Sequence, residues 1–186
     1  MEIKGEYRIA RAREEVWRAL NDPALLAKCI PGCESLELQD DGRMHAQINA
    51  AIGPVRARFD TRITLENLNP PASYTLAGES KSGAAGFGRG RADVRLSEEA
   101  GGTVLDYDAH FTVGGRLAQV GSRLVLGATR KMADDFFGRF SRELDPAAQR
   151  VEIDTGEPAA RKLLNRTLTA AALAALLLLI WWFLLR

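Results

Sequence analysis

The sequence predicts an α+β domain in which a curved antiparallel sheet of about seven strands wraps around one long C-terminal helix, with a single transmembrane helix appended. Three observations predict this class. Apolar and polar residues alternate through 55–66, as in a half-buried antiparallel strand. Apolar residues recur at three- and four-residue steps through 117–144, as in an amphipathic helix. The run 167–185 contains no charged residue, no Pro and no Gly.

The chain begins with a predicted strand and two short helices. Alternation through Glu2–Ile9 indicates the strand. The apolar residues of Arg13–Leu20 share one face and indicate the first helix. Asn21-Asp22-Pro23 ends that helix, and Pro23 suits the first position of a second short helix, 23–27. Pro31-Gly32 then predicts a turn.

Six further strands are expected before the long helix. Turn signals separate them, among them Asp40-Asp41-Gly42 and Gly53-Pro54. Short turns between alternating segments favour antiparallel neighbours, so the strands should form one meandering sheet. The expected strands are 35–39, 43–52, 55–66, 73–80, 88–98 and 103–113.

A single helix of roughly 28 residues is expected over 117–144. It would contain Gly121, which in mid-helix costs about 1 kcal/mol relative to Ala. We expect Gly121 either to permit close contact between helix and sheet or to leave room for a ligand. A curved sheet wrapped around this helix leaves space between the two, and a ligand is expected in that space.

The composition argues against several classes of function. The 25 Lys and Arg residues are balanced by 24 Asp and Glu, and a net charge of +1 gives no support to a nucleic-acid partner. Cys29 and Cys33 have a spacing that is not a zinc pattern, and ordinary thiols are expected. The two histidines, His45 and His110, both fall on polar strand faces. Neither a catalytic nor a metal site is therefore predicted.

The C-terminal segment predicts a membrane anchor, 163–186, joined by a flexible linker, 145–162, to the ligand-binding domain, 1–144. The uncharged run of nineteen residues spans roughly 28 Å as a helix, which matches the hydrocarbon core of a bilayer. Trp181 and Trp182 suit the membrane interface, and the basic residues before the run predict a cytoplasmic domain. A buried core helix or an oligomerisation helix is the alternative. The N-terminus lacks the apolar region of a signal peptide.

The inward faces of the strands and helix supply an apolar lining that suits a hydrophobic ligand. For any single residue of this lining, a place in an ordinary packed core is the simpler interpretation. Phe87 lies in the glycine-rich segment 83–90, which predicts either a mobile lip at the cavity mouth or a plain hairpin. The expected ligand-binding residues are Met44, Ile48, Phe59, Ile63, Phe87, Leu105, Tyr107, Phe111, Leu117, Gly121, Leu124, Met132 and Phe136.

Five arginines are expected on the outward strand faces. They could meet anionic lipid or an acidic partner surface. The alternative is an ordinary solvated face, since Asp and Glu residues are interleaved with them. These arginines are Arg56, Arg58, Arg62, Arg89 and Arg91.

Four stretches of the sequence, which together cover most of residues 3–143, resemble a known family. They are REEVWRALNDPALLAKCIPGCESLE, IGPVRARFDTRITLENLNPP, GAAGFGRGRADVRL and VGGRLAQVGSRLVLGATRKMADDFFGRF. Together and in this order they resemble the CoxG family of carbon monoxide dehydrogenase subunits, within the START-like, polyketide-cyclase-like (SRPBCC) helix-grip superfamily. The hydrophobic tail also agrees with this family, in which some members carry such an anchor.

The resemblance implies a membrane-anchored, non-enzymatic accessory protein. It would recruit a molybdenum hydroxylase of the carbon monoxide dehydrogenase type to the bacterial cytoplasmic membrane. It would bind a respiratory quinone in its cavity, with no covalently bound or metal cofactor, and its partners would be that enzyme, membrane lipid and quinone. The alternatives are a pure recruitment factor without a ligand, and a lipid or small-molecule carrier or enzyme of the wider superfamily.

Overall fold

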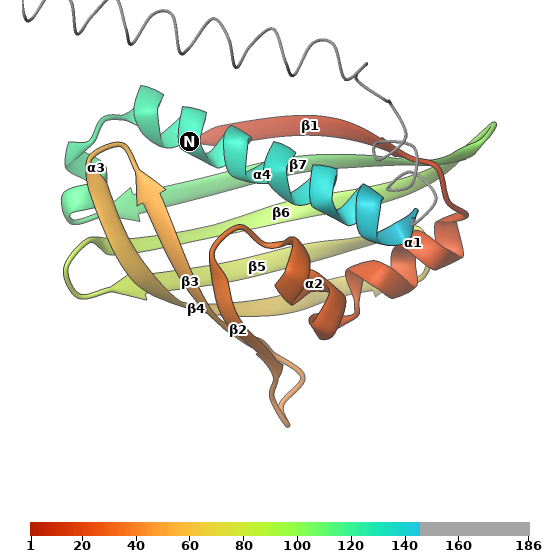
Figure 1. Ribbon diagram of the computed structural model, residues 1–186, viewed down its shortest axis with the longest axis horizontal. Helices are drawn as coiled ribbons and strands as arrows, with labels where there is room; N and C mark the ends of the chain where they lie inside the picture. Colours follow the sequence, from red (N-terminus) through yellow and green to blue (C-terminus); the bar gives the residue numbers. More distant parts are fainter. Residues whose placement is uncertain (146–186) are drawn as a thin grey trace, which may run out of the picture. The chain divides into compact units, whose positions relative to one another are not determined.

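The computed structural model describes residues 1–145, and its order of elements confirms the expected one as far as the last strand (Figure 1). From residue 146 on, the predicted linker and anchor lie outside the described residues. Within 1–145, no helix is both long enough and apolar enough to cross a bilayer. The elements are β1 (Glu2–Ile9), α1 (Arg13–Leu20), α2 (Pro23–Cys29), β2 (Cys33–Leu38), β3 (Met44–Ile52), β4 (Val55–Asn69), β5 (Ser73–Ser82), β6 (Gly86–Glu99), β7 (Gly102–Gly114), α3 (Arg116–Gln119) and α4 (Ser122–Leu144).

The seven strands form one antiparallel sheet in the order β1-β7-β6-β5-β4-β3-β2. Strands β2 to β7 follow one another as neighbours, and β1 pairs with β7. The sheet is curved, and the helices cover its concave face (Figure 1). Because side chains alternate along each strand, the register aligns inward residues in rows across the sheet. Leu76, Ala92 and Ala109 form one such row.

The first two helices begin as their sequences predict. Pro23 occupies the first turn of α2. The backbone N–H groups of a first turn have no partner within the helix, so the N–H that Pro lacks costs no helical hydrogen bond. The Asp22 side chain caps this helix by accepting from the backbone N–H groups of Ala24 and Leu25, at 2.9 and 3.3 Å. In α1, Val16 and Leu20 face the core, with 0% and 6% of their surface exposed.

The expectation of one long helix from 117 to 144 is wrong. The chain forms α3 and α4 instead, with a break at Val120 and Gly121. Gly121 is the N-terminal cap residue of α4 and has a φ of +93°, which L-residues rarely adopt. A Cβ at this position would meet no atom within 4 Å. The glycine at position 121 is therefore explained by the backbone turn, which requires a positive φ. Neither of the two expected reasons, close contact between helix and sheet or room for a ligand, accounts for it.

Two groups of buried residues occupy parts of the space between the helices and the sheet. The larger group surrounds Phe140 of α4, which is completely buried, and includes Val16, Cys29 and Leu105. The smaller group lies at the α3 end and consists of Val55, Phe59, Ala85 and Leu117. Helix α4 packs against α2, β1 and β3. It thus rests on the borders of the sheet and stands away from the middle strands.

Candidate functional site

An apolar cavity of about 320 Å³ lies between the concave face of the sheet and α4. This volume is at the lower end of the range for small-molecule sites. The lining side chains are hydrocarbon except for the thioether of Met44 and the hydroxyls of two tyrosines, and none of them is charged. The lining within residues 1–145 consists of Leu20, Leu26, Ile30, Leu36, Met44, Ile63, Leu65, Tyr74, Leu76, Ala92, Val94, Leu105, Tyr107, Ala109, Ala133, Phe136 and Phe137.

Small residues on both sides keep this space open. Ala92 of β6 and Ala109 of β7 pair across their strands and form part of the cavity floor. Ala133 of α4 is the small residue of the opposite wall. A packed interior normally fills such positions with larger side chains, so the cavity results from their absence.

Aromatic residues form one wall of the cavity. Phe137 stacks on Tyr7 at 4.0 Å between ring centroids and meets Phe136 edge to face at 4.9 Å. The Tyr7 hydroxyl donates to Asp134 Oδ1 at 2.6 Å, and burial together with this bond raises the pKa of Tyr7. Opposite Tyr107 on β1 is Gly5, where a Cβ would lie 2.5 Å from the Tyr107 ring. Gly5 therefore gives the Tyr107 ring the space that it occupies.

Five of the expected ligand-binding residues line this cavity. They come from three strands and from α4, and they face one another across the space as the alternation predicts. Leu105 is almost completely buried, with 1% of its surface exposed. The five are Met44, Ile63, Leu105, Tyr107 and Phe136.

The other expected residues lie elsewhere. Phe59 and Leu117 are buried in the smaller core group at the α3 end. Met132 borders a separate hollow of about 230 Å³ beside Pro31 and Ala50. Leu124 is 54% exposed on the first turn of α4. Outside the cavity lining are also Ile48, half-buried on β3, Phe111, which pairs with Gly90, and Gly121.

Phe87 packs against the neighbouring strand but remains partly exposed. The glycine-rich segment is a hairpin, because β6 already begins at Gly86. The Phe87 ring lies over Gly114, where a Cβ would come within 2.3 Å of it. The Arg89 guanidinium lies 5.2 Å from the centre of the ring. The segment is thus a hairpin that lies outside the cavity lining, and its Phe87 side chain remains 37% exposed.

Twelve lining residues were not among those expected. Alternation along β5 and β6 carries the signal for Tyr74, Leu76 and Val94, which share the inward face. The alanines could not be predicted as lining residues from the sequence. A small residue indicates a cavity only when the residues opposite it in the fold are known. The remaining lining residues of this group are Leu20, Leu26, Ile30, Leu36, Leu65 and Phe137.

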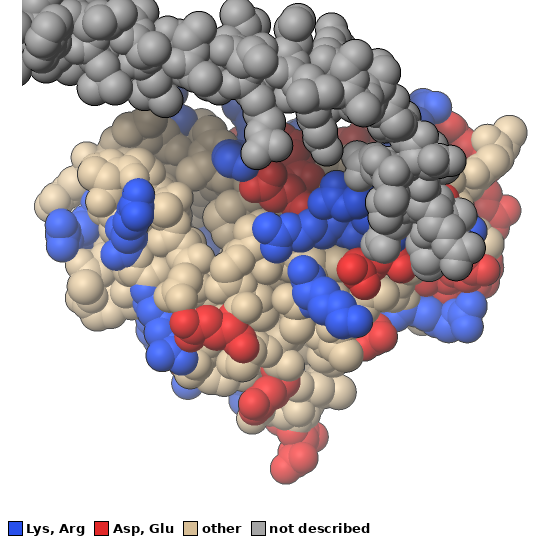
Figure 2. All heavy atoms as spheres, viewed as in Figure 1, with Lys and Arg blue, Asp and Glu red and all other residues tan. Residues whose placement is uncertain are grey.

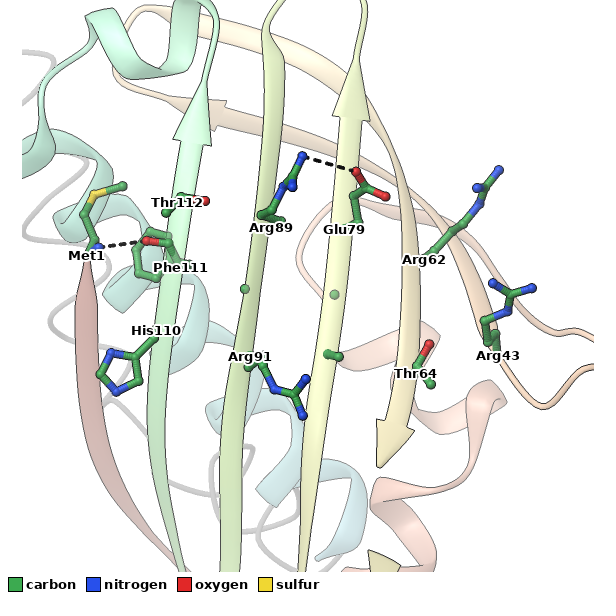
Figure 3. A pocket seen from close by; sticks show the side chains of 13 residues that line it. Met1, Arg43, Arg62, Thr64, Glu79, Arg89, Arg91, His110, Phe111 and Thr112 are labelled. Carbon is green, nitrogen blue, oxygen red and sulfur yellow. Dashed lines mark hydrogen bonds and ion pairs between the residues drawn. The ribbon is translucent and has the colours of Figure 1, made fainter. Parts of the chain in front are cut away.

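The outer face of the sheet carries a second, polar hollow of about 600 Å³ (Figure 3). Arginines from three parts of the chain surround it, and most already have carboxylate partners in the described structure. Arg43 is paired with Asp41 and Arg91 with Glu66, while Arg89 is 4.0 Å from Glu79. Arg62 has no ion pair within residues 1–145. Such interleaved charge is typical of a solvated face.

Charges are also interspersed on the face that carries α4 (Figure 2).

On the outer face, Glu2, Asp108 and His110 come close enough together to hold a metal ion. The Lys4 ammonium, however, lies 3.0 Å from Glu2 and 2.9 Å from Asp108. This cation already pairs with both carboxylates, so the cluster is explained as a surface ion-pair network.

A curved antiparallel sheet closed over a C-terminal helix, with an apolar cavity between them, defines a domain of the helix-grip class. The chain belongs to the CoxG family of carbon monoxide dehydrogenase subunits, and the model of this family matches residues 5–145. The family expected from the sequence is thus confirmed.

Solved structures of similar proteins support the same fold. A conserved protein from Geobacillus kaustophilus is 30% identical, with a TM-score of 0.74 over 79% of this chain and 97% of that one. A protein from Thermus thermophilus is 17% identical, with a TM-score of 0.60 over 79% of this chain and 99% of that one. An uncharacterised protein from Rhizobium leguminosarum is 18% identical, with a TM-score of 0.59 over 76% and 95%. No curated protein matches the sequence.

Proposed function

We propose that this protein is a membrane-anchored, non-enzymatic accessory protein that binds a respiratory quinone and recruits a molybdenum hydroxylase of the carbon monoxide dehydrogenase type. The protein would link that enzyme to the respiratory chain at the bacterial cytoplasmic membrane. The family name supports the choice of partner, since it describes a subunit of carbon monoxide dehydrogenase.

The observation that carries this proposal is the chemistry of the cavity. Its lining offers hydrocarbon and aromatic surface with two phenol hydroxyls and no charged group. A quinone ring with the first part of an isoprenoid chain suits such a surface better than a charged or strongly polar molecule does. A cavity of about 320 Å³ would leave the rest of a long chain outside.

The absence of charged groups in the lining also supports a binding role over a catalytic one. Acid–base catalysis needs titratable groups that converge on the reacting atoms. His45 and His110 instead lie on the outer face, where their Nε2 atoms are 2.8 Å from Asp60 and 3.4 Å from Asp108 respectively. Transport of another apolar molecule, such as a lipid, requires the same cavity and is the nearest competing function.

The direct test is to purify the full chain from bacterial membranes and analyse the organic extract. We expect a respiratory quinone to co-purify, and the emptied protein to bind added quinone on titration. The Ala133→Phe variant, which fills the cavity, should lose the quinone. Failure of the unmodified protein to retain or to bind any quinone would refute this function.

A pure recruitment factor without a ligand makes a different prediction. Filling the cavity would then leave electron transfer from the hydroxylase to membrane quinone unchanged, whereas our proposal requires its loss. Ala133→Phe discriminates between the two because Ala133 lines the cavity. A substitution at Gly121 would not, because Gly121 is outside the lining.

A further inference from the structure

Tyr74 is a polar residue that the cavity buries without a partner. It lies on the inward face of β5 beside Val94, and 6% of its surface is exposed. Its ring meets Trp17 edge to face, with the centroids 5.6 Å apart and the planes at 76°. Tyr74 is thus held by packing on one side and faces the cavity on the other.

The hydroxyl of Tyr74 makes no hydrogen bond with any group in residues 1–145. The other tyrosines near the cavity differ in this respect. Tyr7 donates to Asp134, and the Tyr107 hydroxyl has that of Tyr7 as its neighbour. Phenol hydroxyls of largely buried side chains normally have a partner, because leaving one unsatisfied is unfavourable. The Tyr74 hydroxyl keeps a small accessible surface beside a space of ligand size, where water or a ligand can supply that partner.

We propose that the Tyr74 hydroxyl donates a hydrogen bond to an oxygen of the ligand and thereby selects carbonyl-bearing apolar molecules over pure hydrocarbons of the same shape. This inference rests on the proposed function, since it assigns a role within the same cavity. A quinone ring carbonyl and a lipid ester carbonyl share the chemistry that it requires.

The selectivity follows from the surroundings of the hydroxyl. A hydrocarbon ligand would displace any water from the cavity and leave the Tyr74 hydroxyl without an acceptor. A ligand carbonyl at the same place would satisfy it, in a setting where no other solvent competes. Sites that bury a polar group in this way reject analogues that lack the matching group.

Trp17 supplies a reporter for the test. The chain has three tryptophans, and the other two are Trp181 and Trp182. In the full chain with Trp181→Phe and Trp182→Phe, quinone binding should quench the remaining indole, which touches Tyr74. The probes are 2-methyl-1,4-naphthoquinone, its carbonyl-free analogue 2-methylnaphthalene, and the ester methyl laurate, the last two measured by competition with the quinone.

We expect Tyr74→Phe to weaken naphthoquinone binding about five- to tenfold and to leave 2-methylnaphthalene within about twofold. Tyr7→Phe is the matched control, because Tyr7 is outside the cavity lining and its hydroxyl bonds Asp134, and it should change neither affinity appreciably. Thermal melting of the ligand-free variants checks folding. Tyr74→Phe should melt no lower than the parent, because it removes a hydroxyl that had no partner.

Each outcome bears on the inference. Equal naphthoquinone affinity in the parent and in Tyr74→Phe overturns it while leaving quinone binding intact. An equal loss for naphthoquinone and 2-methylnaphthalene also overturns it, because Tyr74 would then act through packing. If only methyl laurate depends on Tyr74, the donor role is supported and the quinone is replaced by an ester lipid. A parent protein that binds none of the probes refutes the inference and the proposed function together.

Discussion

The side chain of Arg11 closes the C-terminal end of α4, where its Nε donates to the carbonyl oxygen of Leu144 at 2.6 Å. The same guanidinium lies 3.1 Å from the carboxylate of Asp145. The carbonyl oxygen of Arg11 in turn accepts from Thr103 Oγ1 at 2.7 Å. The end of α4, the β1–α1 connection and the start of β7 are therefore joined through one residue.

We expect Arg11→Met to lower the free energy of unfolding by about 1.5–3 kcal/mol, because it removes a charged donor from the last carbonyl groups of a helix. Urea denaturation of the full chain measures the change. Arg18→Met is the control, since the Arg18 side chain bonds only within its own helix, to the Glu14 carbonyl at 3.3 Å. An equal loss in both variants would contradict the role of Arg11.

Two glycines of the C-terminal helical region should respond to alanine in opposite directions. Gly121→Ala should destabilise the protein by about 1 kcal/mol or more, because its φ of +93° is unfavourable for any residue with a Cβ. Gly127→Ala should stabilise it by up to about 1 kcal/mol. Gly127 lies within α4, and a Cβ there would meet no atom within 4 Å. Melting temperatures that shift in the same direction for both would refute this account.

Ala133→Phe should fill the cavity from the helix side. Ligand affinity should fall by more than about tenfold, while the ligand-free protein keeps or gains stability because a void is replaced by apolar contact. Quinone titration and thermal melting measure the two effects. If Phe is too large to fold well, Ala133→Leu tests the same point. Ala128→Leu, at a position that borders the separate hollow beside Met132, should leave affinity unchanged.

Stability should decline in alkaline solution above about pH 10, partly because of Tyr74. Burial raises the pKa of Tyr74 from 10.0 to about 12. Between these values the unfolded chain releases the phenol proton while the folded chain keeps it, so the free energy of unfolding falls as pH rises. Tyr74→Phe should flatten this decline, as measured by urea denaturation at a series of pH values. An unchanged slope would mean that the Tyr74 hydroxyl is not buried.

Much of the fold could be predicted from the sequence because it depends on local periodicity. The alternation in 55–66 belongs to β4, and the Asp22-Pro23 pair begins α2, as expected. The break at Gly121 escaped prediction for a physical reason. Apolar residues recur at helical spacing in the sequence on both sides of the break. A positive φ at the single residue Gly121 interrupts the helix without changing that sequence spacing.

The cavity was harder to predict because it depends on pairs of residues far apart in the chain. Alternation correctly placed Ile63 and Tyr107 on the inward face, and both line the space. Phe59 has the same orientation but lies under the α3 end, where residues of the smaller core group cover it. Alternation identifies which face of a strand is inward, whereas the position of the helix decides which inward residues are in contact with one another.

The alanine pair on the cavity floor has a consequence for how ligand choice can change over time. Ala92 and Ala109 hold their register through backbone hydrogen bonds, to which the side chains contribute nothing. A single substitution to valine or leucine at either position would shorten the cavity without altering the sheet. Members of one family could thus share a scaffold and yet accept ligands of different length. The size of the side chain at each of these two positions would set the length of the cavity.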